Sequence, residues 1–168
     1  HFDYERDMFL FSFYTRGMSF IDMAYLKKSD LKNGIITYRR RKTGQQLTVK
    51  WEKCMEDIIA KYGENTATRY LLPIITNPCS DERTQYRNAI CRINVALKEV
   101  AGLAGLNIPL TMHVARHCWA SVAKSKNIPL SVISEGMGHD SEKTTRIYLA
   151  SLDTSAVDKA NSLILKDF

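Results

Sequence analysis

The chain is organised around one stretch near its C-terminal end, Gly136-Met-Gly-His139-Asp-Ser-Glu-Lys-Thr-Thr-Arg-Ile-Tyr148. Its glycines predict the end of a short helix, because glycine adopts the left-handed conformation that closes helices. Ser141 then caps the next helix, since a serine there accepts a bond from an orphan backbone N–H. Tyr148 falls about two turns into that helix, at roughly 3.6 residues per turn. Taken alone, this stretch leaves open whether Tyr148 packs in a core or reacts.

Length and composition indicate one globular domain. The chain has 168 residues, 45% of them hydrophobic and 25% charged, which is enough to bury a core. No apolar run approaches the roughly 20 residues of a membrane span, and no signal peptide opens the sequence. The four cysteines are scattered without metal-ligand spacing, which favours reduced thiols in a cytoplasmic protein and argues against zinc.

The positive charge is concentrated in one region. The formal net charge is +6, and the segment from Lys27 to Lys53 holds nine Lys or Arg against two acids. A basic stretch of this kind suits a polyanion such as nucleic acid. The alternative is a charged face that only contacts solvent.

The first part of the chain reads as two helices and a hairpin. Residues Asp3–Tyr14 are too densely apolar for a surface helix and predict a core helix. Ser19-x-x-Asp22 has the form of a capping box, which predicts a short helix from Ser19. Gly34–Lys50 predicts a β-hairpin whose turn includes Lys42 and Gly44. Three arginines precede Lys42, so the hairpin is expected to lie along a DNA groove with this lysine at a phosphate.

The remainder is mostly helical. Apolar residues recur at helical spacing in five segments: Trp51–Tyr62, Asp81–Leu103, Thr111–Val122, Pro129–Gly136 and Thr154–Leu165. Tyr70–Ile75 predicts a short edge strand, because its proline cannot donate to a central ladder. The expected fold is therefore mainly α-helical with a small antiparallel β-sheet (α+β), built on the hairpin Ile35–Val49.

His113 and Arg116 lie three residues apart on one predicted helix, so both can point the same way and serve one phosphate. In order along the chain, a block near Arg16, the hairpin Lys42, this pair, Gly138-His139 and Tyr148 resemble the tyrosine recombinases, or phage-integrase family. Each motif is weak alone, but the ordered set at these spacings is specific and spans essentially the whole chain. The block Arg16-Gly-Met-Ser-Phe resembles integrases of conjugative transposons and related mobile elements.

The resemblance implies that residues 1–168 are a single catalytic domain of the tyrosine recombinase fold. The N-terminal core-binding and arm-binding domains of the family are absent from the sequence, so we expect an excised part of a longer protein. The implied activity is that of a site-specific recombinase or integrase that cleaves and rejoins DNA strands.

The family chemistry implies a role for each matching residue. Tyr148 resembles the nucleophile that attacks a backbone phosphorus, forms a 3′-phosphotyrosine and frees a 5′-hydroxyl. His113 accepts the tyrosine proton, and Lys42 is the general acid that protonates the leaving oxygen. Arg116 and His139 hold the non-bridging oxygens. These donors do the work of metal ions, so neither a cofactor nor a metal is implied.

The first block departs from the family pattern Thr-Gly-x-Arg-x-x-Glu. Aligning the acid to Asp22 places Ser19 where the family has arginine. The missing charge then comes from Arg16, one turn earlier, or from the hairpin run Arg39-Arg40-Arg41. Arg16 is the expected candidate, and Ser19 is expected to cap its helix.

The expected partner is double-stranded DNA at recombination sites. The resemblance also implies a synaptic tetramer of the full-length protein on DNA, accessory DNA-bending proteins as an option, no membrane and a cytoplasmic location. Two alternatives stay open: a DNA-binding module without catalysis, and an enzyme of the type IB topoisomerase kind. The target sequence, and integration as against excision, are not indicated.

Overall fold

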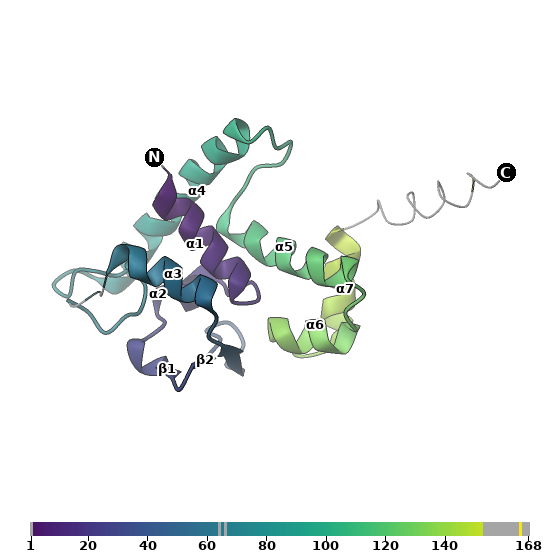
Figure 1. The fold of residues 1–168 in the computed structure, drawn as a ribbon, viewed down its shortest axis with the longest axis horizontal. Coiled ribbons are helices and arrows are strands. Elements are labelled where there is room, and N and C mark those ends of the chain that lie inside the picture. The colour runs from purple at the N-terminus through teal and green to yellow at the C-terminus, as the bar shows by residue number, and fades with distance from the viewer. Residues whose placement is uncertain (1, 64, 66, 153–164, 166–168) are drawn as a thin grey trace. The chain divides into compact units, whose positions relative to one another are not determined.

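The structure is a computed structural model that describes residues 2–63, 65, 67–152 and 165 (Figure 1). The chain divides into two compact units, His1–Trp119 and Ala120–Phe168. We describe each unit by itself. The helix expected over Thr154–Leu165 falls almost wholly on residues outside those described.

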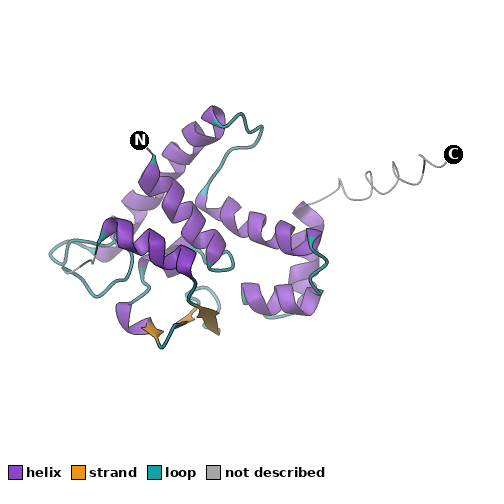
Figure 2. Cartoon of the chain, in the orientation of Figure 1, coloured by secondary structure: helices purple, strands orange, loops and turns teal. Residues whose placement is uncertain are grey.

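The first unit is mostly helical, with a small sheet at one edge, as Figure 2 shows by colour. Its elements are α1 (Asp3–Tyr14), α2 (Phe20–Ala24), a 3₁₀ turn η1 (Lys28–Asp30), β1 (Leu31–Lys32), β2 (Ile35–Arg39), β3 (Gln46–Lys50), α3 (Lys53–Tyr62), α4 (Glu82–Leu103) and the start of α5 (Met112–Ser125). The predicted fold class, mainly α with a small antiparallel sheet, is confirmed.

Local chemistry accounts for the helix ends. Asp81 caps α4, because its carboxylate accepts the backbone N–H of Thr84 at 2.7 Å. Gly63 ends α3 with a φ of +67°, a conformation that costs glycine little. The predicted core helix is α1, and its bounds match the prediction. No helix in the described part of the chain combines the length and apolar character needed to cross a membrane.

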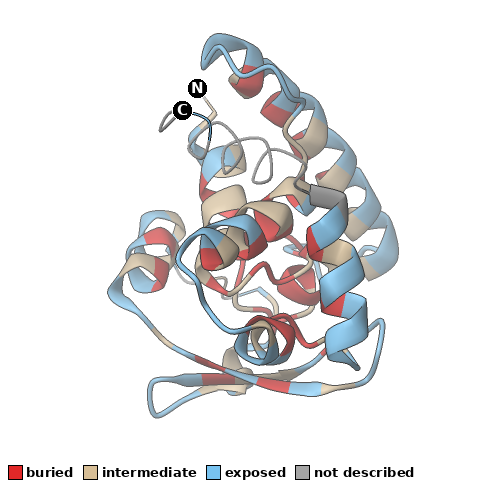
Figure 3. Cartoon of the chain, turned by 90° about the vertical axis from the view of Figure 1, so that its right-hand side faces the viewer, coloured by how far each residue is buried: buried red, intermediate tan, exposed pale blue. Residues whose placement is uncertain are grey.

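The sheet has the order β1-β2-β3, with both pairs antiparallel. In the predicted hairpin, Ile36 pairs with Val49 and Tyr38 with Leu47. Side chains alternate between the two faces of a strand, so Ile36, Val49 and Leu47 are buried while their neighbours on β3 are exposed. Figure 3 shows this alternation along the strands and the separation of buried from exposed sides on the helices.

One hydrophobic cluster holds the first unit together. Its largest fully buried side chains come from α1, α2, β2, α3, α4 and the segments that follow α1, α2 and α3: Met8, Phe11, Met18, Met23, Leu26, Ile36, Met55, Tyr70, Leu72, Ile75, Ile93 and Leu97. The hairpin therefore stands on the same core as α1 and α4, which fixes its base relative to those helices.

The second unit holds the end of α5 with α6 (Leu130–Met137) and α7 (Glu142–Leu152). Helix α6 ends one residue after the predicted Gly136. Gly138 follows with a φ of +66°, and the N–H of His139 donates to the carbonyl of Ser134 at 3.0 Å, which is a Schellman closure. The helix carrying Tyr148 begins after Ser141, as predicted.

Two local predictions were wrong. The segment Tyr70–Ile75 is not a strand; it makes one isolated bridge, between Lys27 and Tyr70. Leu72, Ile74 and Ile75 are all buried, whereas an edge strand would bury alternate residues. Pro73 turns the chain there, and its carbonyl accepts the hydroxyl of Tyr4 at 2.9 Å.

The capping box at Ser19 does not form either. Ser19 precedes α2 as expected, but its side chain makes no cap bond. Its hydroxyl instead donates to the Asp22 carboxylate at 2.7 Å. The carboxylate of Asp22 is charged and therefore a strong acceptor for the hydroxyl proton of Ser19.

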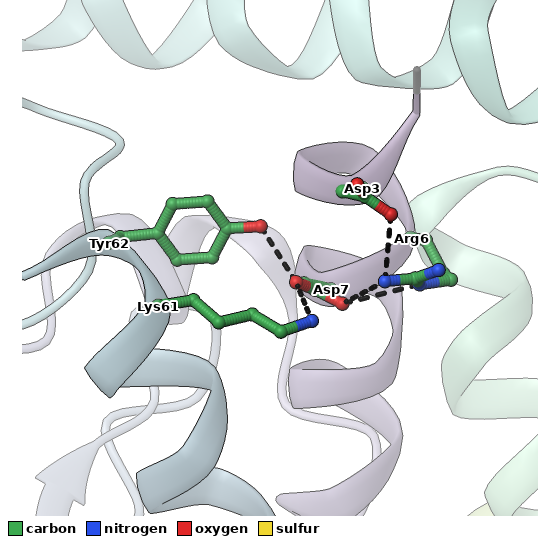
Figure 4. A network of polar contacts seen from close by, with 5 residues as sticks. All are labelled: Asp3, Arg6, Asp7, Lys61 and Tyr62. Atoms are coloured by element: carbon green, nitrogen blue, oxygen red, sulfur yellow. Dashed lines mark hydrogen bonds and ion pairs between the residues drawn. The ribbon is translucent and has the colours of Figure 1, made fainter.

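A buried carboxylate joins α1 to α3 (Figure 4). Asp7, with a side chain 2% exposed, accepts Lys61 Nζ at 2.9 Å and the Tyr62 hydroxyl at 2.7 Å. Arg6 adds an ion pair at 3.2 Å. Burial by itself raises the pKa of this carboxyl, but the hydrogen bonds from Lys61, Tyr62 and Arg6 outweigh burial and lower it.

Asp7→Asn should lower the free energy of unfolding by about 2 kcal/mol, the scale of a hydrogen bond to a charged group. Because the folded pKa is lowered, the stabilisation is full above the unfolded pKa of about 3.9 and is lost as the pH falls through the folded value. Urea unfolding of both proteins across pH tests this.

Asp57→Asn is the matched control, because Asp57 pairs with Lys53 on the exposed surface of α3. It should change stability little and alter the pH profile little. Equal losses in the two variants at neutral pH would contradict the role given to Asp7.

Candidate active site

Arg116 lies on α5 against the turn that follows α1. The residue is 7% exposed, and its Nη1 donates to the carbonyl of Gly17 at 3.0 Å. A Cβ placed on Gly17 would stand 2.7 Å from the Cα of Arg116 and 2.9 Å from its Cγ. Only a glycine allows this approach, so the turn and the arginine are fitted to each other.

The turn itself is a Schellman closure of α1. The N–H of Gly17 donates to the carbonyl of Ser12 at 2.8 Å, and that of Arg16 to the carbonyl of Phe13 at 3.2 Å. Arg16 therefore occupies the position where glycine is usual, with a φ of +63°. A left-handed backbone costs a non-glycine residue roughly 1–2 kcal/mol. The buried hydroxyl of Ser12 stabilises the turn by donating to the carbonyl of Met18 at 2.6 Å.

His113 lies one turn before Arg116 on the same helix. Its ring meets that of His117 edge to face, with centroids 4.5 Å apart. Desolvation lowers the pKa of His113, and the charges of Arg116 and Lys42 lower it further. The ring is therefore predominantly neutral at pH 7, the state in which an imidazole accepts a proton. The predicted residues Arg116 and Lys42 thus both lie within electrostatic reach of His113.

Lys42 lies at the exposed tip of the hairpin, as predicted. The turn is closed by two backbone bonds, from the N–H of Arg40 to the carbonyl of Gln45 at 2.9 Å and from that of Gly44 to the carbonyl of Arg40 at 2.7 Å. Gly44 has a φ of +72°, and a Cβ added to it would meet no atom within 4 Å. This glycine therefore allows the conformation of the turn and makes no close contact.

Arg40 is the buried member of the arginine run. It is 7% exposed, whereas Arg39 and Arg41 are exposed. Burial raises the pKa of the nearby Tyr38 hydroxyl, and Asp22 raises it further. The charges of Arg40, Arg116 and Arg16 lower the pKa of Tyr38. Arg40 has the largest effect of the three and Arg16 the smallest. Three guanidinium groups therefore converge on one region of the first unit.

Sequence reasoning left Arg39, Arg40 and Arg41 equivalent, but period-two alternation separates them. Ile36, Tyr38 and Arg40 follow one another at intervals of two along the hairpin, so Arg40 continues the inward face. This signal was present in the sequence.

The second unit holds His139 and Tyr148. Their rings meet at 70° with centroids 5.6 Å apart. The Nδ1 of His139 lies 2.7 Å from the hydroxyl of the fully buried Thr145. A Thr145 hydroxyl that donates to Nδ1 places the ring proton on Nε2, from which it can be donated to a phosphate. Sequence reasoning missed Thr145, which lies three residues before Tyr148 on the same helix.

The structure therefore brings the predicted residues together in two sets, one in each unit. Among residues 2–63, 65, 67–152 and 165, no three His, Cys, Asp or Glu side chains gather at a spacing that could hold a metal ion. The predicted site residues in that part of the chain offer guanidinium, ammonium, imidazole and phenol groups.

A comparison with protein families identifies the family of the chain. The phage integrase family matches residues 4–155, and the chain belongs to this family. No curated protein sequence matches it.

Solved structures share the fold at low sequence identity. XerA recombinase matches with a TM-score of 0.64 at 20% identity, over 96% of this chain and 61% of its own. XerH recombinase, in a post-cleavage complex with a palindromic difH substrate, gives 0.67 at 20% identity, over 95% and 45%. The catalytic domain of bacteriophage HP1 integrase gives 0.51 at 18%, over 93% and 79%. The chain thus spans less than two thirds of the XerA and XerH chains, 61% and 45% respectively.

Gly17→Ala should destabilise the protein more than Gly34→Ala, although both glycines have a φ of +72°. Both substitutions carry the left-handed penalty of roughly 1–2 kcal/mol. Only at Gly17 does the new Cβ meet a helix backbone, and such overpacking costs a further 1–3 kcal/mol or so. Denaturant unfolding measures the difference; equal losses would show that Arg116 does not lie against this turn.

Proposed function

We propose that the chain is the catalytic part of a site-specific DNA recombinase that cleaves and rejoins strands through a 3′-phosphotyrosine. One observation carries the proposal above the others. Arg116 is buried yet charged, and it is fixed by a glycine that no other residue can replace, with His113 and Lys42 within electrostatic reach. A buried guanidinium beside a second one favours an anion such as a phosphodiester.

In the proposed reaction the oxygen of Tyr148 attacks the phosphorus of a DNA strand. His113, neutral at pH 7, takes the phenolic proton, and Arg116 holds the non-bridging oxygens. The bond to the 5′-oxygen breaks as Lys42 supplies a proton to it. Tyr148 is then joined to the 3′ end, and a 5′-hydroxyl from another strand reverses the step without ATP.

His139 assists from the helix end that precedes α7. Its contact with Thr145 orients the ring, and a threonine hydroxyl that donates to Nδ1 leaves the ring proton on Nε2. We assign it a hydrogen bond to the same phosphate. Thr145 is a positioning residue in this scheme.

The second guanidinium is assigned to Arg40 rather than to Arg16. Arg40 is as buried as Arg116, and its charge acts on Tyr38 more strongly than that of Arg16. Arg16 lies on a left-handed turn at the edge of the same region and is given a supporting role. For the catalytic arginine that the first block lacks, we therefore prefer a residue of the hairpin to Arg16.

The proposed substrate is duplex DNA at recombination sites, bound through the basic hairpin. A synaptic tetramer, formed by the longer protein with or without DNA-bending partners, is the assembly in which strands exchange. The block Arg16-Gly-Met-Ser-Phe favours an integrase of a conjugative transposon or related mobile element, acting in the cytoplasm. Two functions compete with this proposal. One is a type IB topoisomerase, which uses similar catalytic groups, and the other is a DNA-binding module that cleaves no strand.

Tyr148→Phe should fold and bind DNA normally but form no covalent adduct, because only the hydroxyl is removed. The substrate is a pool of duplexes nicked at one position and randomised on both sides of the nick. The wild-type chain should trap its preferred sequences as an SDS-resistant adduct when the short 5′-hydroxyl strand diffuses away.

Tyr25→Phe is the matched control and should keep the adduct. An adduct with Tyr148→Phe would assign the nucleophile elsewhere. No adduct with the wild-type chain would favour the binding module.

Arg40→Ala should slow cleavage by roughly 10²-fold or more, the scale of losing one preorganised donor. Arg16→Gly should slow it far less, and glycine suits the left-handed backbone, so this variant should be at least as stable as the wild type. Single-turnover cleavage of a duplex recovered from the pool measures both rates. The reverse order of effects would return the role to Arg16.

A further inference from the structure

The residue before Lys42 is held on both its backbone and its side chain. The backbone N–H of Arg41 donates to Oδ1 of Asp22 at 2.9 Å. Oδ2 of the same carboxylate accepts the hydroxyl of Ser19 at 2.7 Å. Asp22 is only 5% exposed, so its orientation is set by these two bonds from either side.

The side chain of Arg41 lies over an aromatic ring. Its guanidinium carbon is 3.7 Å from the centroid of Tyr25, well inside the range of a cation–π contact. Tyr25 directly follows α2 and is braced in turn by two rings. It meets the buried Tyr70 edge to face at 5.7 Å and lies 6.4 Å from Tyr86 of α4. The platform beneath Arg41 therefore belongs to the core.

Beyond this point the turn is held by contacts within the hairpin, where Nη1 of Arg39 donates to the carbonyl of Gly44 at 3.0 Å. Every residue from Arg41 to Gly44 is exposed, and the turn is closed by backbone bonds at its base. An exposed lysine on such a turn samples many directions. A general acid, however, must stay within hydrogen-bond reach of the atom it protonates.

We propose that Arg41 and Tyr25 form a clamp that positions the hairpin turn, so that Lys42 reaches the leaving 5′-oxygen. This inference rests on the proposed function and adds two positioning residues to it. The clamp acts on one step, the donation of a proton by Lys42. It leaves the attack by Tyr148 and the phosphate contacts of Arg116 untouched.

A direct contact of Arg41 with DNA is the competing explanation. Arg41 lines a pocket of about 350 Å³ together with the basic side chains of Lys27 and Arg39, where a phosphate could be attracted. Tyr25 separates the two explanations, because it has no charge to offer a phosphate. Tyr25→Leu removes the ring face beneath the guanidinium, and Tyr25→Phe keeps it.

The test compares two versions of a duplex recovered from the nicked pool. One has the ordinary 5′-oxygen at the cleaved phosphate, and the other has a 5′-bridging sulfur. When Tyr148 attacks the sulfur version, the phosphorus–sulfur bond breaks and a thiolate leaves. A thiol has a pKa of about 8.5, so the thiolate is a good leaving group and needs no general acid to protonate it. A loss of proton donation by Lys42 should therefore slow cleavage of the oxygen substrate and leave cleavage of the sulfur substrate unchanged.

Tyr25→Leu and Arg41→Ala should each slow cleavage of the oxygen substrate about tenfold, a part of the 10²–10⁴-fold effect of a general acid. Both should cleave the sulfur substrate at the wild-type rate, as Lys42→Ala should. The double variant should be no slower than either single one, because the two residues act as a unit. Tyr25→Phe and Lys27→Ala should resemble the wild type on both substrates.

The clamp is disproved by equal slowing on both substrates, which would mark a general structural effect, or by normal rates on the oxygen substrate. Slowing by Arg41→Ala but not by Tyr25→Leu would assign Arg41 to DNA contact instead. Thermal unfolding of each variant identifies loss of fold, and Arg41→Ala, at an exposed side chain, keeps the test valid if Tyr25→Leu does not fold. A wild-type chain without any adduct would refute the proposed function itself.

Discussion

The approach of Arg116 to Gly17 is the constraint on which the rest of the site depends. A side chain at position 17 would overlap the backbone of α5, so the turn after α1 and the helix of His113 and Arg116 can approach only through this glycine. The same contact gives the buried guanidinium a carbonyl acceptor, since burying a charge without a partner is costly. The left-handed residue beside the glycine is the strained part of the arrangement, and it is an arginine.

The hairpin depends on the same core by a different route. Ile36 and Val49 anchor its base in the cluster shared with α1 and α4, and the inward face continues to Arg40. Beyond Arg40 the apolar contacts end. The position of Lys42 then rests on contacts of Arg41 with α2 and Tyr25, together with the bond from Arg39 to the carbonyl of Gly44 inside the turn. A proton donor must stay within hydrogen-bond reach of the leaving oxygen, so the contacts that hold this turn matter for the proposed chemistry.

Much of this could be predicted from the sequence. Dense apolar residues marked α1, the turn residues marked the hairpin, and spacing placed His113 and Arg116 on one face. The structure added what spacing cannot determine. Ser19 had the pattern of a cap, but its hydroxyl donates to the Asp22 carboxylate and accepts no backbone N–H of α2. Tyr70–Ile75 had the composition of a strand, but tertiary packing buries consecutive residues there in an irregular turn. The choice among three successive arginines could have been made from the period-two alternation of the strand, whereas the fit of Gly17 to Arg116 joins residues 99 positions apart.

The identity of the residue that bonds to DNA tests the central claim most directly. The trapped adduct can be treated with nuclease and trypsin and analysed by tandem mass spectrometry. Trypsin cuts after Arg146 and Lys159, so the account predicts a 3′-linked nucleotide on the peptide of residues 147–159, at Tyr148. A nucleotide joined through its 5′ end, or carried by any other residue, would contradict it.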